Sequence, residues 1–215
     1  MNFIAIGPDK NKDQIIKCTR EGDYCLLIYN YSGSITVEIL KEKINVSIYG
    51  IYIGTDERKF RLNTIQHHKK GKSVSDLLIK GVFFDESSFY YEGLIKIDKN
   101  AQQSNAYQKN QNILMSDGVY VDSRPYLEIE ANDVRCTHGS TTGKLSEETL
   151  TFLNLRGLTA DSARQLLLTG FVEDVFDKID LLGCKKEAKE SKIECLGELE
   201  TLFHEQKNKS ISGSE

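Results

Sequence analysis

The chain has 215 residues, of which 39% are hydrophobic, 28% charged and 9% aromatic, and it contains no tryptophan. This composition is typical of a soluble globular protein and excludes collagen, a disulfide scaffold and wholesale disorder. The formal net charge is -4. Because no excess of basic residues is available to bind a phosphate backbone, nucleic acid is not expected as the main partner.

The sequence contains no targeting or membrane segment that we can identify. No apolar stretch approaches the ~20 residues that a membrane-spanning helix needs, and residues 1–14 lack the basic start and apolar core of a secretory signal. We therefore expect a cytoplasmic protein whose five cysteines are reduced. The odd number of cysteines and the absence of a C-x-x-C motif argue against a disulfide framework and a closed zinc site.

From about residue 3 to residue 129 the sequence is a succession of short segments with the alternation of β-strands. Apolar residues occur at every second position over 35–39 and again over 44–48, and later segments of this type cover 77–84, 88–97, 112–115, 119–121 and 126–130. No helical pattern separates the segments, so βαβ units are not expected. The alternation leaves a sandwich, a barrel and a β-helix open.

The periodicity changes at Ser146. Residues 146–157 begin with a capping serine and acidic residues and end at Gly157, which predicts a first helix. A second helix is predicted from Thr159 and a third over the charged segment that follows. Their expected apolar positions are Leu166, Leu167, Phe171, Val175 and Ile179 in the second and Ile193, Leu196, Leu199 and Phe203 in the third. The predicted organisation is a β-rich body over 1–145, a helical domain over 146–205 and a disordered tail over 206–215.

Two groups of side chains are weak candidates for chemistry, and the common nucleotide-binding and hydrolase motifs are absent. Asp122, Glu128 and Glu130 could act as paired carboxylates, and Glu128 and Glu130 would share one face of a strand, although a solvated strand face explains them equally well. His67 and His68 are adjacent, so on a strand they would point to opposite faces and could not easily bind one metal.

The stronger candidate is the segment 135–139, which reads RCTHG. If it is extended, Cys136 and His138 project from the same face. A thiolate beside an imidazole suits zinc, copper(I) and iron–sulfur clusters. Two ligands make only half a site, so a second chain or a transient occupant would be needed. Cys184 and Cys195, about three helical turns apart, are interpreted as ordinary helix residues.

The region 107–157 resembles the SufB/SufD family of iron–sulfur cluster assembly proteins. The resemblance is carried by YQKNQNILMS over 107–116, by VDSRPYLEIEANDVRCTHGSTTGKLSEETLTFLNLRGL over 121–158 and by ARQLLLTGF over 163–171. It implies a right-handed parallel β-helix with a C-terminal α-helical domain. It also implies a dimer formed through the β-helices and docking of SufC, an ABC-type ATPase, on the helices over 147–156 and 160–178.

The motifs resemble the SufD branch more than the SufB branch. SufD-type chains read C-x-H-G, as residues 136–139 do, whereas SufB-type chains carry a cysteine at the position of Asn110 and glutamates beside the histidine. Because the cysteine of SufB-type chains is missing here, the resemblance does not imply that this chain can assemble a cluster on its own. Typical chains of the family are longer and carry an extra N-terminal region that is absent here. A reduced lineage that works as a homodimer is favoured over a subunit that needs a SufB-like partner.

The resemblance implies a non-enzymatic scaffold subunit for iron–sulfur cluster assembly. A transient cluster would be bound by Cys136 and His138, with Glu128 and Glu130 as weaker candidates for oxygen ligands, and a cysteine desulfurase would supply the sulfur. One alternative is an interaction module that keeps the fold and binds SufC without holding a cluster. Another is a β-helix polysaccharide lyase or hydrolase, which the lack of tryptophan and of a secretion signal disfavours.

Overall fold

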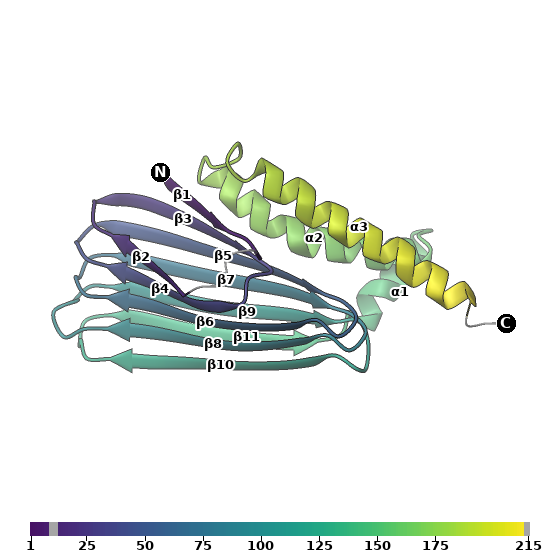
Figure 1. Cartoon of the computed structure of the whole chain (residues 1–215), viewed down its shortest axis with the longest axis horizontal. Helices are drawn as coiled ribbons and strands as arrows, with labels where there is room; N and C mark the ends of the chain where they lie inside the picture. Colours follow the sequence, from purple (N-terminus) through teal and green to yellow (C-terminus); the bar gives the residue numbers. More distant parts are fainter. Residues whose placement is uncertain (9–12, 213–215) are drawn as a thin grey trace.

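A computed structural model describes the backbone of residues 1–8 and 13–212, with side chains up to Gln206. Within these residues, eleven strands are followed by three helices (Figure 1). The first sheet, called sheet A, contains β1 (Asn2–Ile6), β3 (Gly22–Tyr29), β5 (Ile44–Gly54), β7 (Val74–Phe83), β9 (Asn105–Leu114) and β11 (Arg135–Gly143) in that order. The second, sheet B, contains β2 (Gln14–Cys18), β4 (Gly33–Ile39), β6 (Lys59–His68), β8 (Ser88–Ile97) and β10 (Tyr120–Ile129).

The chain passes from one sheet to the other with every strand, and all strand pairs are parallel. In sheet A, Ser47 pairs with Asp76, Asp76 with Tyr107, and Tyr107 with Thr137, so one turn takes about 30 residues. The result is a β-solenoid of about four turns. The parallel β-helix with C-terminal helices that the family resemblance implied is confirmed.

The inward positions of sheet A change from apolar to polar along the solenoid axis. In β3, β5 and β7 they carry mainly apolar side chains of the core, and aromatic rings stack in the middle turns, such as Tyr52 and Phe89 with centroids 4.5 Å apart. In β9 the inward positions include Gln108, Asn110 and Asn112, and the end of β6 in sheet B adds Gln66 and His68. Each of these five polar side chains is less than 5% exposed. Burial lowers the pKa of His68 to about 4, so its imidazole is neutral at physiological pH.

The predicted helix starts are confirmed. In α1 (Glu147–Leu155) the side chain of Ser146 accepts a hydrogen bond from the Thr149 N–H, and in α2 (Ala160–Leu181) Thr159 accepts one from the Ser162 N–H. The third helix, α3 (Lys189–Ser212), extends beyond residue 205, and residues 213–215 of the expected tail lie outside the described residues. None of the described helices has both the length and the apolar character to cross a membrane.

The helices α2 and α3 lie side by side over the outer face of sheet A (Figure 1). Apolar side chains of β3, β5 and β7 form one buried cluster with both helices. The buried positions in α2 and α3 are Ala163, Leu168, Val172, Val175, Phe176, Ile179, Cys195, Leu199 and Leu202. Of the apolar positions expected, Val175, Ile179 and Leu199 are buried, whereas Leu166 and Ile193 are 54% and 63% exposed. The buried face therefore coincides only in part with the one expected, because it follows the outer surface of sheet A.

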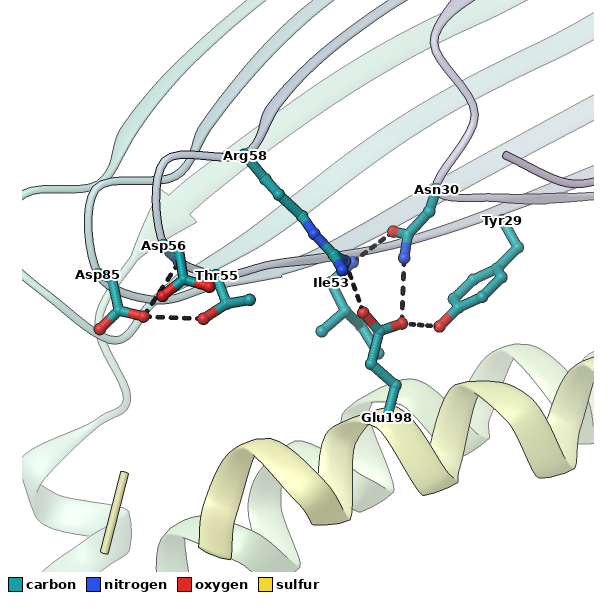
Figure 2. A network of polar contacts seen from close by, with 8 residues as sticks. All are labelled: Tyr29, Asn30, Ile53, Thr55, Asp56, Arg58, Asp85 and Glu198. Atoms are coloured by element: carbon teal, nitrogen blue, oxygen red, sulfur yellow. Dashed lines mark hydrogen bonds and ion pairs between the residues drawn. The ribbon is translucent and has the colours of Figure 1, made fainter. Parts of the chain in front are cut away.

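Polar contacts also fasten the helices to the solenoid. Figure 2 shows the carboxylate of Glu198 pointing from α3 toward the turns that follow β3 and β5. It accepts hydrogen bonds from the Tyr29 hydroxyl, from Asn30 Nδ2 at 3.2 Å and from Arg58 Nη1 at 2.7 Å. On α2, Asp174 Oδ2 accepts a hydrogen bond from Lys80 Nζ at 2.7 Å, and this lysine is only 5% exposed.

Removing the Glu198 carboxylate should therefore weaken the attachment of α3. We expect Glu198→Ala to lower the free energy of unfolding by about 1–2 kcal/mol, since charge-assisted hydrogen bonds are lost and the Tyr29 hydroxyl keeps no acceptor there. Urea unfolding followed by circular dichroism measures the effect. Glu200→Ala, an exposed position on the same helix, is the control. Equal stability of the two variants would contradict a role for the network.

Candidate functional site

The last turn of the solenoid leaves both of its strands at an edge. β10 is the final strand of sheet B and β11 the final strand of sheet A, and within the described residues no strand pairs with their outer edges. β10 pairs with β8 and β11 pairs with β9 on the other side. A strand edge of this kind presents unpaired N–H and C=O groups that can bind another chain.

Cys136 lies on the inner face of β11. Its register partner is Ala106, which is fully buried, and Cys136 packs against the small apolar cluster that includes Ile95 and Ile97. Burial raises the pKa of the Cys136 thiol above its ordinary value, although a backbone hydrogen bond at Ala106 partly offsets the increase. The free chain therefore carries a protonated, half-buried thiol at this position.

His138 is two residues further along the same strand and so shares the inner face with Cys136. Its register partner is the buried Gln108, whereas His138 itself is exposed. The extended conformation on which the thiol–imidazole interpretation depended is thus present. The described residues contain no group of three or more His, Cys, Asp or Glu side chains that could hold a metal. One chain offers only two candidate ligands at its open end, Cys136 and His138.

A ladder of buried polar residues lies behind these two ligands. The register of β9 and β11 places Gln108 beside His138, Asn110 beside Ser140, and Asn112 beside Thr142. The Asn112 Nδ2 donates to Asn110 Oδ1 at 2.5 Å and to Thr142 Oγ1 at 3.2 Å. Gln108 and Asn112 were not expected from the sequence, and Asn110 was noted only as the position where SufB-type chains carry a cysteine. Their signal was the recurrence of carboxamides at every second position over 108–112, which places all three on one face of a strand.

The carboxylate candidates do not join this site. Glu128 lies on the outer face of sheet B, where it forms an ion pair with Lys96. Glu130 follows the end of β10, and its N–H donates to the Ile97 carbonyl. The structure brings neither carboxylate to the inner face on which Cys136 and His138 lie.

Asp122, the third carboxylate, forms an ion pair with a residue on its own strand. It receives two hydrogen bonds from the Arg124 guanidinium, at 3.0 Å and 2.6 Å. A carboxylate held in this bidentate pair is a poor general base. His67 and His68 point to opposite faces, as predicted, since His67 contacts Asp98 outside the solenoid and His68 contacts Ser75 inside it.

Apolar side chains surround the open end. Leu127 and Ile129 occupy inward positions of β10, in register with the fully buried Ile95 and Ile97, yet they are 42% and 40% exposed. In every earlier turn these positions are covered by the turn that follows. Their exposure shows that the terminal turn has an inner surface suited to burial against another polypeptide.

The helices next to the solenoid end also carry exposed apolar side chains. They are Phe152 and Leu155 on α1 and Leu166 on α2, of which Leu155 is 83% exposed. Beside the start of α2 there is also a groove of about 500 Å³, with Phe84, Met115 and Phe203 among its lining residues. Large apolar side chains next to a groove are typical of protein-binding surfaces.

Comparison with known proteins identifies the family to which the chain belongs. A family model described as the SufBD core domain of the SUF system for FeS cluster assembly matches residues 27–171. The chain is similar to the iron–sulfur cluster assembly protein SufD of Escherichia coli, with 32% identity over 120 residues, 56% of this chain and 28% of that protein. It is also similar to SufD of Bacillus subtilis, with 28% identity over 137 residues, 64% of this chain and 31% of that protein. It therefore spans about a third or less of the length of these curated relatives.

The exposure of the cysteines leads to a prediction about their reactivity. Cys136 is half-buried and the other four are buried, so in dilute protein Cys136 should react first with a thiol-specific reagent such as iodoacetamide. Since its pKa is raised, the thiolate is scarce at neutral pH, and the rate should still increase above pH 9. Mass spectrometry of the labelled chain measures this rate. Cys136→Ala should remove the fast phase and Cys195→Ala should retain it; a fast phase that survives Cys136→Ala contradicts the assignment.

Proposed function

Because the chain belongs to the SUF system SufBD core family, we propose that it is a non-enzymatic scaffold subunit on which iron–sulfur clusters are built. The family takes part in iron–sulfur cluster assembly. The single observation that carries the assignment of a site is the position of Cys136 and His138 on the inner face of the terminal turn, where both strand edges are unpaired. In this proposal the protein works in the cytoplasm, where its thiols stay reduced.

Iron and sulfide are the cargo of this site rather than a resident cofactor. Thiolate sulfur and imidazole nitrogen are both known ligands of iron–sulfur clusters, which take four protein ligands. One chain supplies two, and the described residues hold no larger group of metal ligands. A second subunit placed against the open end would supply the missing half.

A second copy of the chain fits this requirement. The β10 and β11 edges and the exposed Leu127 and Ile129 form one continuous surface at the solenoid end. Two such ends related by a twofold axis would bury the apolar side chains and bring two copies of Cys136 and His138 to one interface. The same surface could instead receive a SufB-like subunit, and the experiment below separates the two partners.

The state of the Cys136 thiol favours transient rather than permanent binding. Its pKa is raised by burial, so binding of iron must displace a proton. This requirement opposes metal binding at neutral pH and eases as the pH increases. A cluster assembled here would be released more readily than one held by four preformed thiolates, which suits a scaffold that passes its product on.

The exposed surface of Phe152, Leu155 and Leu166 is the docking site that we assign to a SufC-type ABC ATPase. The surface lies on α1 and on the start of α2, and α1 begins four residues after the end of β11. A partner that binds there can transmit movement directly to the strand that carries Cys136 and His138. The cysteine desulfurase supplies sulfur to the assembly and needs no surface of its own on this chain.

The main alternative is an interaction module that binds the ATPase without holding a cluster. It is favoured by two observations, namely that one chain offers only two ligands and that the Cys136 thiol is protonated. In this case the inner face of the terminal turn would serve pairing alone. Loss of the two ligands would then leave assembly unchanged.

Anaerobic reconstitution with iron and sulfide tests the scaffold. The wild-type chain should form a dimer with a labile visible chromophore, and Cys136→Ala and His138→Ala should each reduce the iron retained after gel filtration by more than half while the dimer persists. Cys18→Ala and His204→Ala, which lie away from the terminal turn, are the matched controls. Absorption, iron analysis and light scattering give the three readouts.

The outcomes distinguish the partners. A dimer that forms no chromophore, and whose retained iron is the same in the wild type and in both variants, would support the interaction module and overturn the cluster site. A monomer that acquires the chromophore only with a SufB-like subunit would overturn the homodimer. Leu127→Glu should place a charge in the contact and yield a monomer, whereas Leu155→Glu on α1 should leave the dimer intact.

Docking of the ATPase has its own test. Leu155→Ser should weaken binding of the purified SUF-system ATPase at least tenfold, because burial of a leucine contributes roughly 1.5–3 kcal/mol and each 1.4 kcal/mol is about a factor of ten. Isothermal titration calorimetry measures the dissociation constant. Leu181→Ser, at the opposite end of α2 and 89% exposed, is the control and should bind normally. Equal affinities for both variants would remove α1 from the docking surface.

A further inference from the structure

We propose that the thiols of Cys25 and Cys184 form a redox-sensitive pair that can be oxidised to a disulfide, fastening the connection between α2 and α3 to strand β3 of sheet A. This modification site is separate from the terminal turn and independent of the proposed cluster site. It concerns how firmly the two-helix cover is held on the solenoid.

The two cysteines meet at the interface between the sheet and the cover. Cys25 lies in β3 and points outward, as Leu27 and Tyr29 do, into the cluster that packs under α2 and α3. Cys184 lies in the connection between the two helices, beyond the end of α2. It was interpreted from the sequence as a helix residue, and this interpretation was wrong. Both side chains belong to this buried cluster and lie within interaction distance of each other, and they are 0% and 2% exposed.

The other three cysteines have different surroundings. Cys18 lies in the core between the two sheets, and Cys136 lies in the terminal turn. Cys195 belongs to the same cluster under the helices, but its charged neighbours are Glu194 and Glu198. Oxidation within the folded chain should therefore select one pair out of the five thiols.

The chemistry requires a two-electron oxidant, for which hydrogen peroxide represents the class of peroxides. A Cys184 thiolate would attack one peroxide oxygen and break the O–O bond, giving a sulfenic acid and hydroxide. The Cys25 sulfur would then attack the sulfenic sulfur, forming the S–S bond and releasing the sulfenic oxygen as water. In total, two thiols and one peroxide give one disulfide and two waters.

The surroundings of the pair set the rate of this reaction. Burial raises the pKa of Cys25 to about 12, and burial together with Glu187 raises that of Cys184, which the N-terminal amine partly opposes. Thiolates are therefore rare in the closed state, and the oxidant has no direct path to either sulfur. The reaction should proceed through local opening of the connection, which contains Gly183 at a φ of 81°.

Oxidation would change the mechanics of the cover. In the reduced protein the helices are held by apolar packing and by polar contacts such as those of Glu198. A disulfide between residues 25 and 184 would link the connection covalently to a strand that is paired on both sides. Opening at this end of the helix pair would then require distortion of sheet A.

Peptide mapping of the wild-type chain tests the pair directly. Trypsin places the five cysteines on separate peptides, since lysine or arginine residues intervene between them, and Cys25 falls in 21–41 and Cys184 in 179–185. After treatment with hydrogen peroxide and blocking of free thiols, unreduced digestion should yield these two peptides joined. Each oxidised chain should have lost two titratable thiols, and a reductant should restore both. Retention of all five thiols, or a link to any other cysteine, would overturn the pair.

Variants and hydrogen exchange test the consequence. Cys25→Ala and Cys184→Ala should each abolish the loss of thiols, whereas Cys195→Ala, equally buried in the same cluster, should retain it. In the oxidised wild type, amide exchange over residues 182–188 should slow at least severalfold relative to the reduced form and recover on reduction. Unchanged exchange in a chain that carries the mapped disulfide would overturn the fastening role. The wild-type mapping remains decisive if a variant fails to fold.

Discussion

In a parallel β-solenoid each turn is covered only by the turns before and after it, so any apolar surface without a neighbouring turn must be covered by something else. In this chain α2 and α3 cover the outer face of sheet A, where they bury the apolar side chains of β3, β5 and β7. The last turn has no such cover within the described residues. Leu127 and Ile129 stay partly exposed, and the edges of β10 and β11 stay unpaired. The candidate site follows from this constraint, because Cys136 and His138 belong to the uncovered turn.

The position of α1 connects the two exposed surfaces of the molecule. Residues 144–146 alone separate β11 from α1, so the apolar surface of Phe152 and Leu155 is joined almost directly to the strand of the site. By contrast, α2 and α3 are fixed to the solenoid through Lys80 and Glu198. A partner bound at α1 therefore lies between an anchored helix pair on one side and, on the other, a strand that is paired along only one of its edges.

The sequence predicted the apolar strands well and the polar strands poorly. β8 spans Ser88–Ile97, as its alternation indicated. By contrast, β6 was not recognised, β9 was recognised only over its last residues, and β11 was considered only as a segment that might be extended. Their inward positions carry Gln66, His68, Gln108 and Asn110, so burial does not coincide with hydrophobicity there. Only the family resemblance distinguished a solenoid from a sandwich, because register between distant turns leaves no local pattern. Cys136 and His138 were placed correctly on one strand face, while Glu128 could not be excluded without knowing that Leu127 and Ile129 face inward.

The change from an apolar to a polar interior has a consequence for folding. The early turns gain stability from buried aliphatic and aromatic side chains. In β9, near the end of the stack, Gln108 Oε1, Asn110 Nδ2 and Asn112 Oδ1 are buried without a partner among the described residues, which costs free energy. In a quasi-one-dimensional stack such a gradient gives folding a direction: the first turns nucleate, and the last ones add on with little net gain. The terminal turn is thus the part of the solenoid that a neighbouring molecule can most easily order.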